Sequence, residues 1–406
     1  MTSATDPANA PTVPVPRQRG HRTTHRADVS APGKFIGRDR YLDMLRALAL
    51  FRVVLYHTFG WGWLTLVFPS MGVMFALAGS LTARSLTNRR SLSVLWSRVR
   101  RLLLPLWLFG AVVLAALFAA GWGPAKGEEA WWWAKLVFWV VPVGTPPFPL
   151  KIGHEGGLLD EGWPLQAIAP LWYLRAYLWF VLLSPLLLRA FRRLPWVTLL
   201  APLALAAVVG TDLVTIPGAT GDAITDFAVY GSCWVLGFAH HDGLFHQIPR
   251  YLNPSISPIV MAVGLWWASG HLGPMGWDLN DIPLAQALWS FGYCALLLQV
   301  SPAWPRLPDR LERLDKPITL ANNRAMTIYL WHEIALLATV PLLDLVWKVS
   351  AVWQSPLLSG LLSSSYVLLM FLLVWPLLGL LMVACGWAED LSARRRPRLW
   401  PNRGRK

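Results

Sequence analysis

The feature that most constrains this chain is a series of apolar runs that are too long for any water-facing surface. Two examples are residues 102–121 and 357–385, each long enough to cross a hydrocarbon core of about 30 Å as one helix. Charged residues make up only 14% of the 406 residues, against roughly 25% in soluble globular chains. The sequence therefore predicts an all-α, polytopic membrane protein.

We expect about ten transmembrane helices with both termini in the cytoplasm. Basic residues gather in alternate connections, whereas the opposite connections hold only Lys126, Lys151 and Lys348, so the basic ones are placed inside. A short apolar stretch at 131–143 is assigned to an external segment, 122–167, as an interfacial or re-entrant element, because a crossing there would turn the later basic connections outward. The expected spans are 41–60, 64–84, 102–121, 168–188, 196–212, 224–240, 256–271, 283–300, 323–346 and 359–386.

The membrane region is expected to cover residues 39–387, between two basic tails. Residues 1–38 lack apolar periodicity and are predicted to be a disordered N-terminal tail, and residues 388–406 form a C-terminal tail. The net charge of +14 lies mostly in connections and tails, which favours topology and anionic lipid headgroups over nucleic acid as its explanation. The three cysteines lie in apolar runs and show no disulfide or metal-ligand spacing.

The first span carries three ionisable groups, Arg46, Arg52 and His57, inside an otherwise apolar helix. Such groups are expensive at membrane depth unless paired or hydrated, so they are candidates for function. Arg46 and His57 are eleven residues apart, which places both on one helix face and about 17 Å apart along its axis. Asp43 lies one turn before Arg46 and is expected to pair with it. Arg52 faces away, where we expect an ion pair or a snorkelling side chain.

Each histidine also has a structural interpretation. His57 can be a buried, hydrogen-bonded residue without a catalytic role, and His332 in the ninth span can join two helices by a hydrogen bond. Three further histidines follow the sixth span near Asp242, where an interfacial polar turn is favoured over a metal site. These are His240, His241 and His246, and the external residues His154, Glu155, Asp160 and Glu161 are expected to be solvated unless they contact an acceptor.

Five motifs in order give the chain its family resemblance. Asp43-x-x-Arg46, followed after ten residues by His57, resembles the signature of the acyltransferase-3 family of integral-membrane acyltransferases. The resemblance extends from about Arg38 to Cys385, with two departures: Ser80 follows Gly79, and Arg175 stands where many members carry an acid. The other motifs are Phe68 to Leu81, Arg98-Val-Arg-Arg101-Leu-Leu-Leu-Pro105, Pro170-Leu-Trp172-Tyr-Leu-Arg175 and Ile328-Tyr-Leu-Trp331-His332.

The resemblance implies transfer of an acyl group from cytoplasmic acyl-CoA to a hydroxyl of a sugar-containing or other hydroxylated acceptor. His57 would be the general base, since an imidazole accepts a proton at neutral pH. Arg46, supported by Asp43, would hold a phosphate or carbonyl of the donor. Arg98 and Arg101 would bind CoA phosphates at the cytoplasmic mouth. His332 and Trp172 are the remaining substrate-binding candidates.

The expected partners are the acyl-CoA co-substrate, the acceptor and the lipid bilayer, with no nucleic acid, bound cofactor or metal. The expected location is the cell membrane, as a multi-pass protein of the bacterial cytoplasmic membrane. A transporter or permease with an intramembrane Arg/His pathway is the rival interpretation, because such residues also serve proton relays and substrate paths. Many transporters contain repeated halves, and the absence of a convincing internal repeat here favours the enzyme.

Overall fold

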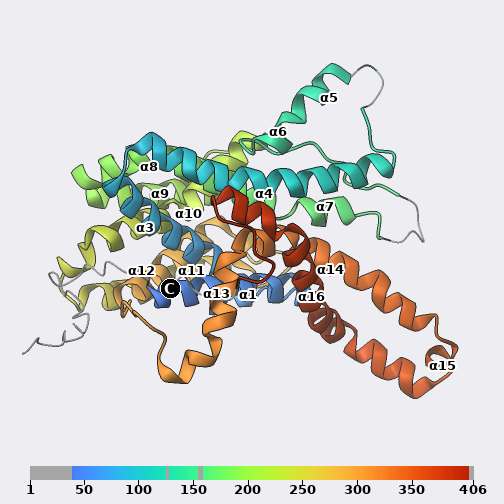
Figure 1. The fold of residues 1–406 in the computed structure, drawn as a ribbon. Helices are drawn as coiled ribbons and strands as arrows, with labels where there is room; N and C mark the ends of the chain where they lie inside the picture. The colour runs from blue at the N-terminus through green and yellow to red at the C-terminus, as the bar shows by residue number, and fades with distance from the viewer. Residues whose placement is uncertain (1–38, 125–126, 128, 154–158, 402–406) are drawn as a thin grey trace, which may run out of the picture. The chain divides into compact units, whose positions relative to one another are not determined.

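The computed structural model describes residues 39–401, apart from 125–126, 128 and 154–158, and within this part every named element is a helix (Figure 1). The predicted N-terminal tail, the last residues of the predicted C-terminal tail, and His154 with Glu155 lie outside the described residues. The all-α prediction is therefore confirmed for the described part of the chain.

Helices occupy all ten of the predicted spans. The shortest is α9, of 16 residues, and the longest is α16, of 37 residues, which continues well beyond the predicted end of the last span. In chain order they are α1 (Arg40–Phe59), α3 (Ser70–Asn88), α4 (Ser91–Ala119), α8 (Leu171–Arg193), α9 (Pro195–Gly210), α10 (Gly218–Asp242), α11 (Leu252–Ser269), α12 (Pro283–Gln299), α14 (Ala325–Trp347) and α16 (Pro356–Ser392).

Two of the predicted boundaries differ from the structure in a way that changes how a segment is assigned. The second span is divided at Pro69 into α2 (Leu64–Val67) and α3, because proline has no N–H to continue the hydrogen-bond ladder. α4 begins at Ser91, so the Arg-rich sequence before residue 102 is helical and not a connection. The short elements are α5 (Glu129–Lys135), α6 (Val137–Val140), α7 (Trp163–Ile168), η1 (Leu244–His246), η2 (Leu279–Asp281), η3 (Asp309–Leu314), α13 (Asp315–Asn323) and α15 (Ser350–Trp353).

Five helical segments of the described chain are long and apolar enough to cross a membrane. They are Leu64–Asn88, Ser91–Ala119, Trp163–Arg193, Ala325–Trp347 and Pro356–Ser392. α1 does not meet this measure although it is 20 residues long, and it contains Arg40, Asp43, Arg46 and Arg52. The stretch at 131–143 forms α5 and α6, of 7 and 4 residues, which are too short to cross a bilayer.

The closest helix pair in the bundle is α3 against α10, and two glycines permit it. A Cβ atom on Gly79 would lie 2.2 Å from the backbone oxygen of Trp234, and one on Gly237 would lie 2.2 Å from that of Ala76. Small residues at such crossings let two backbones approach closely, which is how helices associate where no water drives them together. The glycine of the second-span motif is thus a packing residue.

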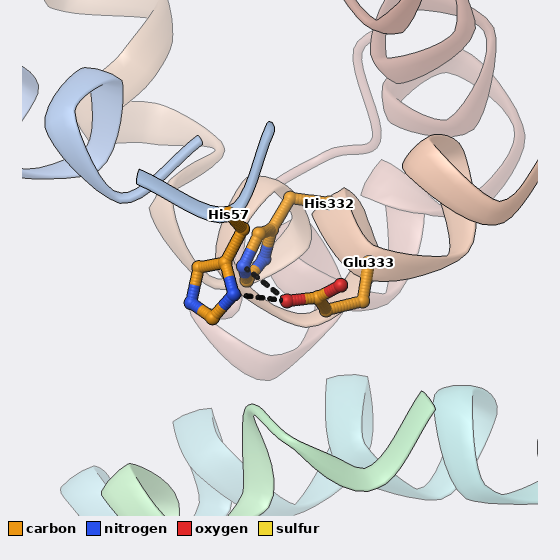
Figure 2. A group of neighbouring side chains, drawn as sticks. All are labelled: His57, His332 and Glu333. Carbon is orange, nitrogen blue, oxygen red and sulfur yellow. Dashed lines mark ion pairs between the residues drawn. The ribbon is translucent and has the colours of Figure 1, made fainter. Parts of the chain in front are cut away.

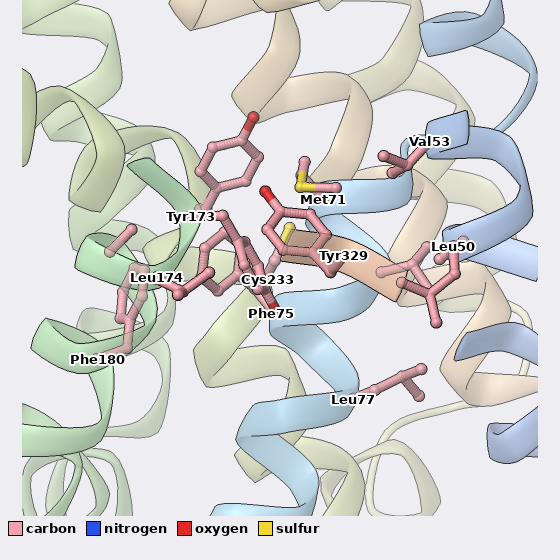
Figure 3. Close-up of a cluster of buried hydrophobic side chains, with 14 of the residues drawn as sticks. Leu50, Val53, Met71, Phe75, Leu77, Tyr173, Leu174, Phe180, Cys233 and Tyr329 are labelled. Atoms are coloured by element: carbon pink, nitrogen blue, oxygen red, sulfur yellow. The ribbon is translucent and has the colours of Figure 1, made fainter. Parts of the chain in front are cut away.

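An aromatic core joins four helices, α3, α8, α10 and α14, around this crossing. Phe75 of α3 is fully buried and its ring centroid lies 4.8 Å from that of Tyr173 on α8 and 5.1 Å from that of Phe180. Tyr329 of α14 joins the same cluster, with its ring centroid 5.0 Å from that of Tyr173 (Figure 3). Aromatic pairs at these separations add to the area that they bury. The core therefore holds α8 and α14 in fixed positions beside α1.

Local capping fixes the two helices that carry the candidate site. Asp39 caps α1 by accepting a hydrogen bond from the Tyr41 N–H at 2.9 Å, and Gly60, with φ of 64°, ends it in the left-handed conformation. The first turn of α14 is capped from another helix, because Glu389 of α16 accepts hydrogen bonds from the N–H groups of Met326 and Thr327. A carboxylate there also complements the helix dipole.

Candidate active site

Three side chains from two helices form a cluster on which the candidate site is built. His57 comes from the last turn of α1, and His332 and Glu333 are neighbours in α14 (Figure 2). The His57 Nδ1 lies 2.5 Å from Glu333 Oε1, and the two imidazole centroids are 5.0 Å apart. The side chains of His332 and Glu333 are 2% and 7% exposed, whereas that of His57 is 33% exposed. His57 is thus the member of the cluster that a substrate can reach.

The contacts assign a hydrogen-bond direction to His57. An ionised carboxylate only accepts hydrogen bonds, so the proton between His57 and Glu333 is donated by Nδ1. The Nε2 of a neutral His57 then carries its lone pair outward and can accept a proton from a substrate hydroxyl. The carboxylate holds the ring in this orientation and stabilises the imidazolium that forms, as in other histidine–carboxylate pairs.

His332 is placed differently. Its Nδ1 lies 2.7 Å from the backbone oxygen of Tyr329, and its Nε2 lies 3.7 Å from Glu333 Oε1 without a hydrogen-bond partner. The nitrogen that faces the carboxylate is buried. The imidazole of His332 therefore lies on the buried side of the His57–Glu333 pair.

The same three side chains also have the composition of a metal site. Their candidate ligand atoms all lie within 4.8 Å of one another. Two ligands that share one tetrahedral ion at about 2.1 Å would be about 3.4 Å apart. His57 Nδ1 and Glu333 Oε1 are 2.5 Å apart, which is the separation of a charge-assisted hydrogen bond. The geometry therefore favours a hydrogen-bonded base.

A cavity of about 260 Å³ lies beside the N-terminal half of α1, away from His57. We call it the basic cavity because several arginines line it. The prediction placed Arg46, Arg98 and Arg101 near a donor, and the structure brings all three to this one cavity. Its other charged residues are Arg395 and Glu389, and tyrosines form part of its wall. The polar and aromatic residues that line it also include Tyr173, Tyr177, Asn322, Asn323, Tyr329 and Ser392.

The predicted pairing of Asp43 with Arg46 is wrong in its partner. Asp43 accepts a hydrogen bond from Arg40 at 2.9 Å, and Arg40 also reaches Asp315 and Thr319 on α13. The Arg46 guanidinium donates instead to Asn322 Oδ1 at 3.0 Å. Asn322 in turn donates to the Asp43 backbone oxygen at 2.7 Å, so it links the two residues. The partner of Arg46 is thus Asn322 of α13, far along the chain, and helical spacing within α1 cannot predict such a contact.

Two further cavities adjoin His57. The aromatic cavity, of about 330 Å³, is lined by His57, Trp172, Arg175 and mainly apolar residues that include Phe138 and Trp139. The polar cavity, of about 340 Å³, is lined by His57 and Trp172 together with polar side chains from α1, α10, η2 and α12. These are Arg52, Tyr56, Thr225, Asp226, Tyr230, Asn280 and Gln286. His57 and Trp172, both predicted site residues, therefore lie at the junction of two cavities.

Tyr329 lines both the basic cavity and the polar cavity, so these two cavities meet at this residue. It belongs to the aromatic core beside Tyr173, which also lines the basic cavity. A flexible chain bound in the basic cavity would have to pass these two rings to reach His57. Arg46 and His57 lie on opposite sides of this junction, as their axial separation on α1 predicts.

Arg52 is neither snorkelling nor ion-paired within the described part of the chain. It is 7% exposed, its Nε donates to the Leu64 backbone oxygen at 3.4 Å, and its Cζ lies 4.8 Å from the centroid of the Tyr56 ring. The cation–π contact replaces the expected ion pair.

Arg175, which departs from the family pattern, pairs with Asp226 of α10 at 2.8 Å and donates to Thr145. It thus joins the aromatic and polar cavities.

Sequence reasoning did not identify Glu333, Tyr329 or Arg395 as site residues. A glutamate inside an apolar span is itself a signal of function, and its position next to His332 could have singled it out. Tyr329 lies within the Ile328 to His332 motif, but nothing in its spacing distinguishes a cavity wall from a core residue. Arg395 lies in a tail that looked like one more basic terminus.

The described residues thus form a helical bundle with helices suited to a membrane, a carboxylate-bound histidine beside two cavities and an arginine-lined cavity, an arrangement that can support base chemistry. The chain matches the family model of the acyltransferase domain over residues 39–388, and it belongs to that family, acyltransferase family 3. Membership supports an acyltransferase function in general. It also agrees with the membrane character of the apolar helices.

Two other comparisons returned nothing. No curated protein matches this chain, and no solved structure does. The family assignment thus rests on the match over residues 39–388.

Proposed function

We propose that this protein is a membrane-bound O-acyltransferase that moves an acyl group from acyl-CoA to a hydroxyl of a sugar-containing or other hydroxylated acceptor. The observation that carries the proposal is His57, held by Glu333 at 2.5 Å while it lines two cavities. A histidine fixed at one nitrogen and accessible at the other is what proton abstraction from a hydroxyl requires. Family membership supplies the acyl-transfer part.

In the proposed reaction the acyl group passes directly from the thioester to the acceptor. Nε2 of His57 takes the proton of the acceptor hydroxyl as that oxygen forms a bond to the thioester carbonyl carbon. The C–S bond then breaks, the acyl group stays on the acceptor oxygen as an ester, and the imidazolium returns its proton to the leaving sulfur. The products are the acylated acceptor and free CoA, and no bound cofactor or metal is required. Glu333 stabilises the imidazolium throughout.

The two substrates are assigned to different cavities. CoA carries several phosphate charges, and the basic cavity presents Arg46, Arg98 and Arg101, whose guanidinium groups suit phosphate. The acceptor is assigned to the polar and aromatic cavities, where Trp172 offers a face for a sugar ring. The axial offset of about 17 Å between Arg46 and His57 is comparable with the reach of a pantetheine arm.

The proposed topology places these cavities on the two sides of the membrane. Ten spans with both termini in the cytoplasm put the basic cavity on the cytoplasmic side, where acyl-CoA is made, and His57 in the outer half. The external segment 122–167 would then cover the acceptor side. We place the protein in the bacterial cytoplasmic membrane, with a cell-envelope molecule or a glycosylated small molecule as its acceptor.

The test is acceptor-dependent release of CoA by the purified protein. Wild type, His57→Ala and His271→Ala are assayed with acetyl-, propionyl- and butyryl-CoA against a panel of glycosides. His271 is an exposed histidine outside the three cavities, so it is the matched control. Turnover lost in a folded His57→Ala protein and kept in His271→Ala supports the proposal. Turnover that survives in His57→Ala removes His57 as the base.

Wild-type protein that releases no CoA with any acceptor would contradict the enzyme. Transport of the acyl donor or of a glycoside across liposomes would then favour the permease, because buried Arg, His and Glu residues also serve substrate paths.

A further inference from the structure

The chain reverses direction at the end of α16, and the residues that follow return to the bundle. The backbone N–H of Arg395 donates to the backbone oxygen of Asp390 at 2.8 Å, and the backbone N–H of Arg394 donates to that of Leu391 at 2.9 Å. This is the Schellman pattern, with Arg394 in the left-handed position at φ of 55°. The predicted C-terminal tail is therefore folded over residues 393–401.

Buried polar contacts hold this segment in place. Arg324, whose side chain is 0% exposed, pairs with Asp390 at 2.8 Å and also donates to the backbone oxygen of Arg398. The Arg398 N–H donates to the same Asp390 carboxylate at 3.0 Å. Asn323 donates to the backbone oxygen of Pro401 at 2.8 Å. Two adjacent residues at the junction of α13 and α14 thus bind the segment at two points.

The returning segment forms part of the wall of the basic cavity. Ser392, Ala393 and Arg395 line it together with arginines of α1 and α4. The one acid among the lining residues is Glu389, and its carboxylate is already engaged by Thr327 and by two backbone N–H groups of α14. Arg395 therefore adds a fourth guanidinium to Arg46, Arg98 and Arg101, and the cavity keeps a strong positive charge.

We propose that residues 393–401 are a built-in wall of the donor site and that Arg395 binds a phosphate of acyl-CoA. The proposal rests on the proposed function for the identity of the donor. A guanidinium presents a fork of donors that matches phosphate oxygens, and arginine remains charged at any physiological pH. The buried anchors at Arg324 and Asn323 position the segment before the donor arrives, so less ordering is needed on binding.

Equilibrium binding to the full-length protein in detergent tests this without requiring turnover. CoA, 3′-dephospho-CoA and pantetheine are titrated into wild type, Arg395→Ala, Arg395→Lys and Arg396→Ala. Arg396 is exposed, carries the same charge and does not line the cavity, so it is the matched control for net charge. Near-equal thermal stability of the variants shows that the fold is kept.

We expect Arg395→Ala to weaken CoA binding about tenfold, because one charge-assisted contact is lost. Arg395→Lys should lose less, Arg396→Ala should change the affinity by less than about twofold, and pantetheine should bind all four proteins equally. A loss that disappears with 3′-dephospho-CoA assigns Arg395 to the 3′-phosphate, and a loss that remains assigns it to the diphosphate. Both outcomes support the proposal.

Three results would overturn it. Arg395→Ala that binds CoA like wild type removes the contact. Equal losses in Arg395→Ala and Arg396→Ala indicate a general field and not a site. An equal loss for CoA and pantetheine indicates a disturbed wall and not a phosphate contact. Wild type that binds CoA but shows no acyl transfer contradicts the proposed function, whereas the contribution of Arg395 to CoA binding is still measured.

Discussion

The basic cavity and the two cavities at His57 are built on opposite plans. The basic cavity collects four arginines from α1, α4 and the segment after α16, and each of them adds a similar charge to one shared volume. The cavities at His57 depend on a single contact of 2.5 Å between α1 and α14, surrounded by aromatic and polar walls. Under the proposed function, donor binding would be shared by several groups in the basic cavity, whereas the chemistry would depend on one pair of side chains.

This difference has a consequence for substitutions. Loss of one of several arginines removes a fraction of the attraction for a charged donor, so the remaining ones still bind it. Loss of a member of the His57–Glu333 pair would remove the proposed base or its orientation, and the neighbouring imidazole of His332 is buried. Effects on catalysis and on donor affinity should therefore separate.

The largest of the four effects is expected for Glu333→Gln. The amide keeps the size of the side chain but not the charge that orients His57 and stabilises the imidazolium, so kcat should fall by about 10²-fold. The KM for acyl-CoA should stay near that of wild type. Steady-state kinetics checks this, with Glu312→Gln in η3 as an exposed control. An unchanged kcat would show that catalysis does not depend on the contact between His57 and Glu333.

A smaller effect is expected for Arg46→Ala. The guanidinium lies in the basic cavity and is positioned by Asn322, so its loss should raise the KM for acyl-CoA by about 10- to 30-fold, the effect of one charge-assisted interaction. The kcat at saturation should change much less, and Arg46→Lys should recover part of the loss. A fall in kcat with an unchanged KM would place Arg46 in the chemistry instead.

Trp172→Ala sharpens the comparison from the acceptor side. Trp172 lines both cavities at His57, and its ring is stacked on Tyr230 at 5.7 Å. We expect the KM for a glycoside acceptor to rise about fivefold, in line with one aromatic contact, and the KM for acyl-CoA to stay unchanged. Kinetics with both substrates varied measures this. A larger effect on acyl-CoA than on the acceptor would exchange the assignments of the cavities.

The smallest effect is expected for Arg394→Gly. Arg394 holds a left-handed φ of 55° that a non-glycine residue adopts only with strain, so glycine should raise the free energy of unfolding by about 0.5 kcal/mol. Thermal unfolding in detergent detects the sign as a slightly higher melting temperature. CoA affinity should stay unchanged, because Arg394 does not line the basic cavity. A lower melting temperature would show that the Arg394 side chain itself stabilises the turn.

The helices and several site residues could be predicted because local signals report them. Apolar runs of sufficient length placed helices at all ten expected spans, and the ionisable groups of α1 were conspicuous in an apolar background. The helical spacing of Arg46 and His57 gave their separation along α1. The motif order in the sequence also led to the family that the chain belongs to.

The remainder depends on contacts between distant segments, which one sequence does not contain. Glu333 becomes the partner of His57 only because α14 packs against α1, and Asn322 takes the place expected for Asp43 because α13 packs against α1. Arg395 looked like part of a solvated tail, and it lines the basic cavity only because Arg324 and Asn323 anchor the segment after it. The sequence predicted where helices form, but it did not predict which side chains of different helices contact one another.

The most direct test of the account is CoA binding by His57→Ala, measured beside its turnover. CoA should bind within about twofold of wild type while acceptor-dependent acyl transfer falls by about 10²- to 10⁴-fold, because the proposed general base has been removed and the basic cavity is intact. Lost CoA binding in a folded His57→Ala protein, or transfer at the wild-type rate, would contradict the separation of donor binding from catalysis.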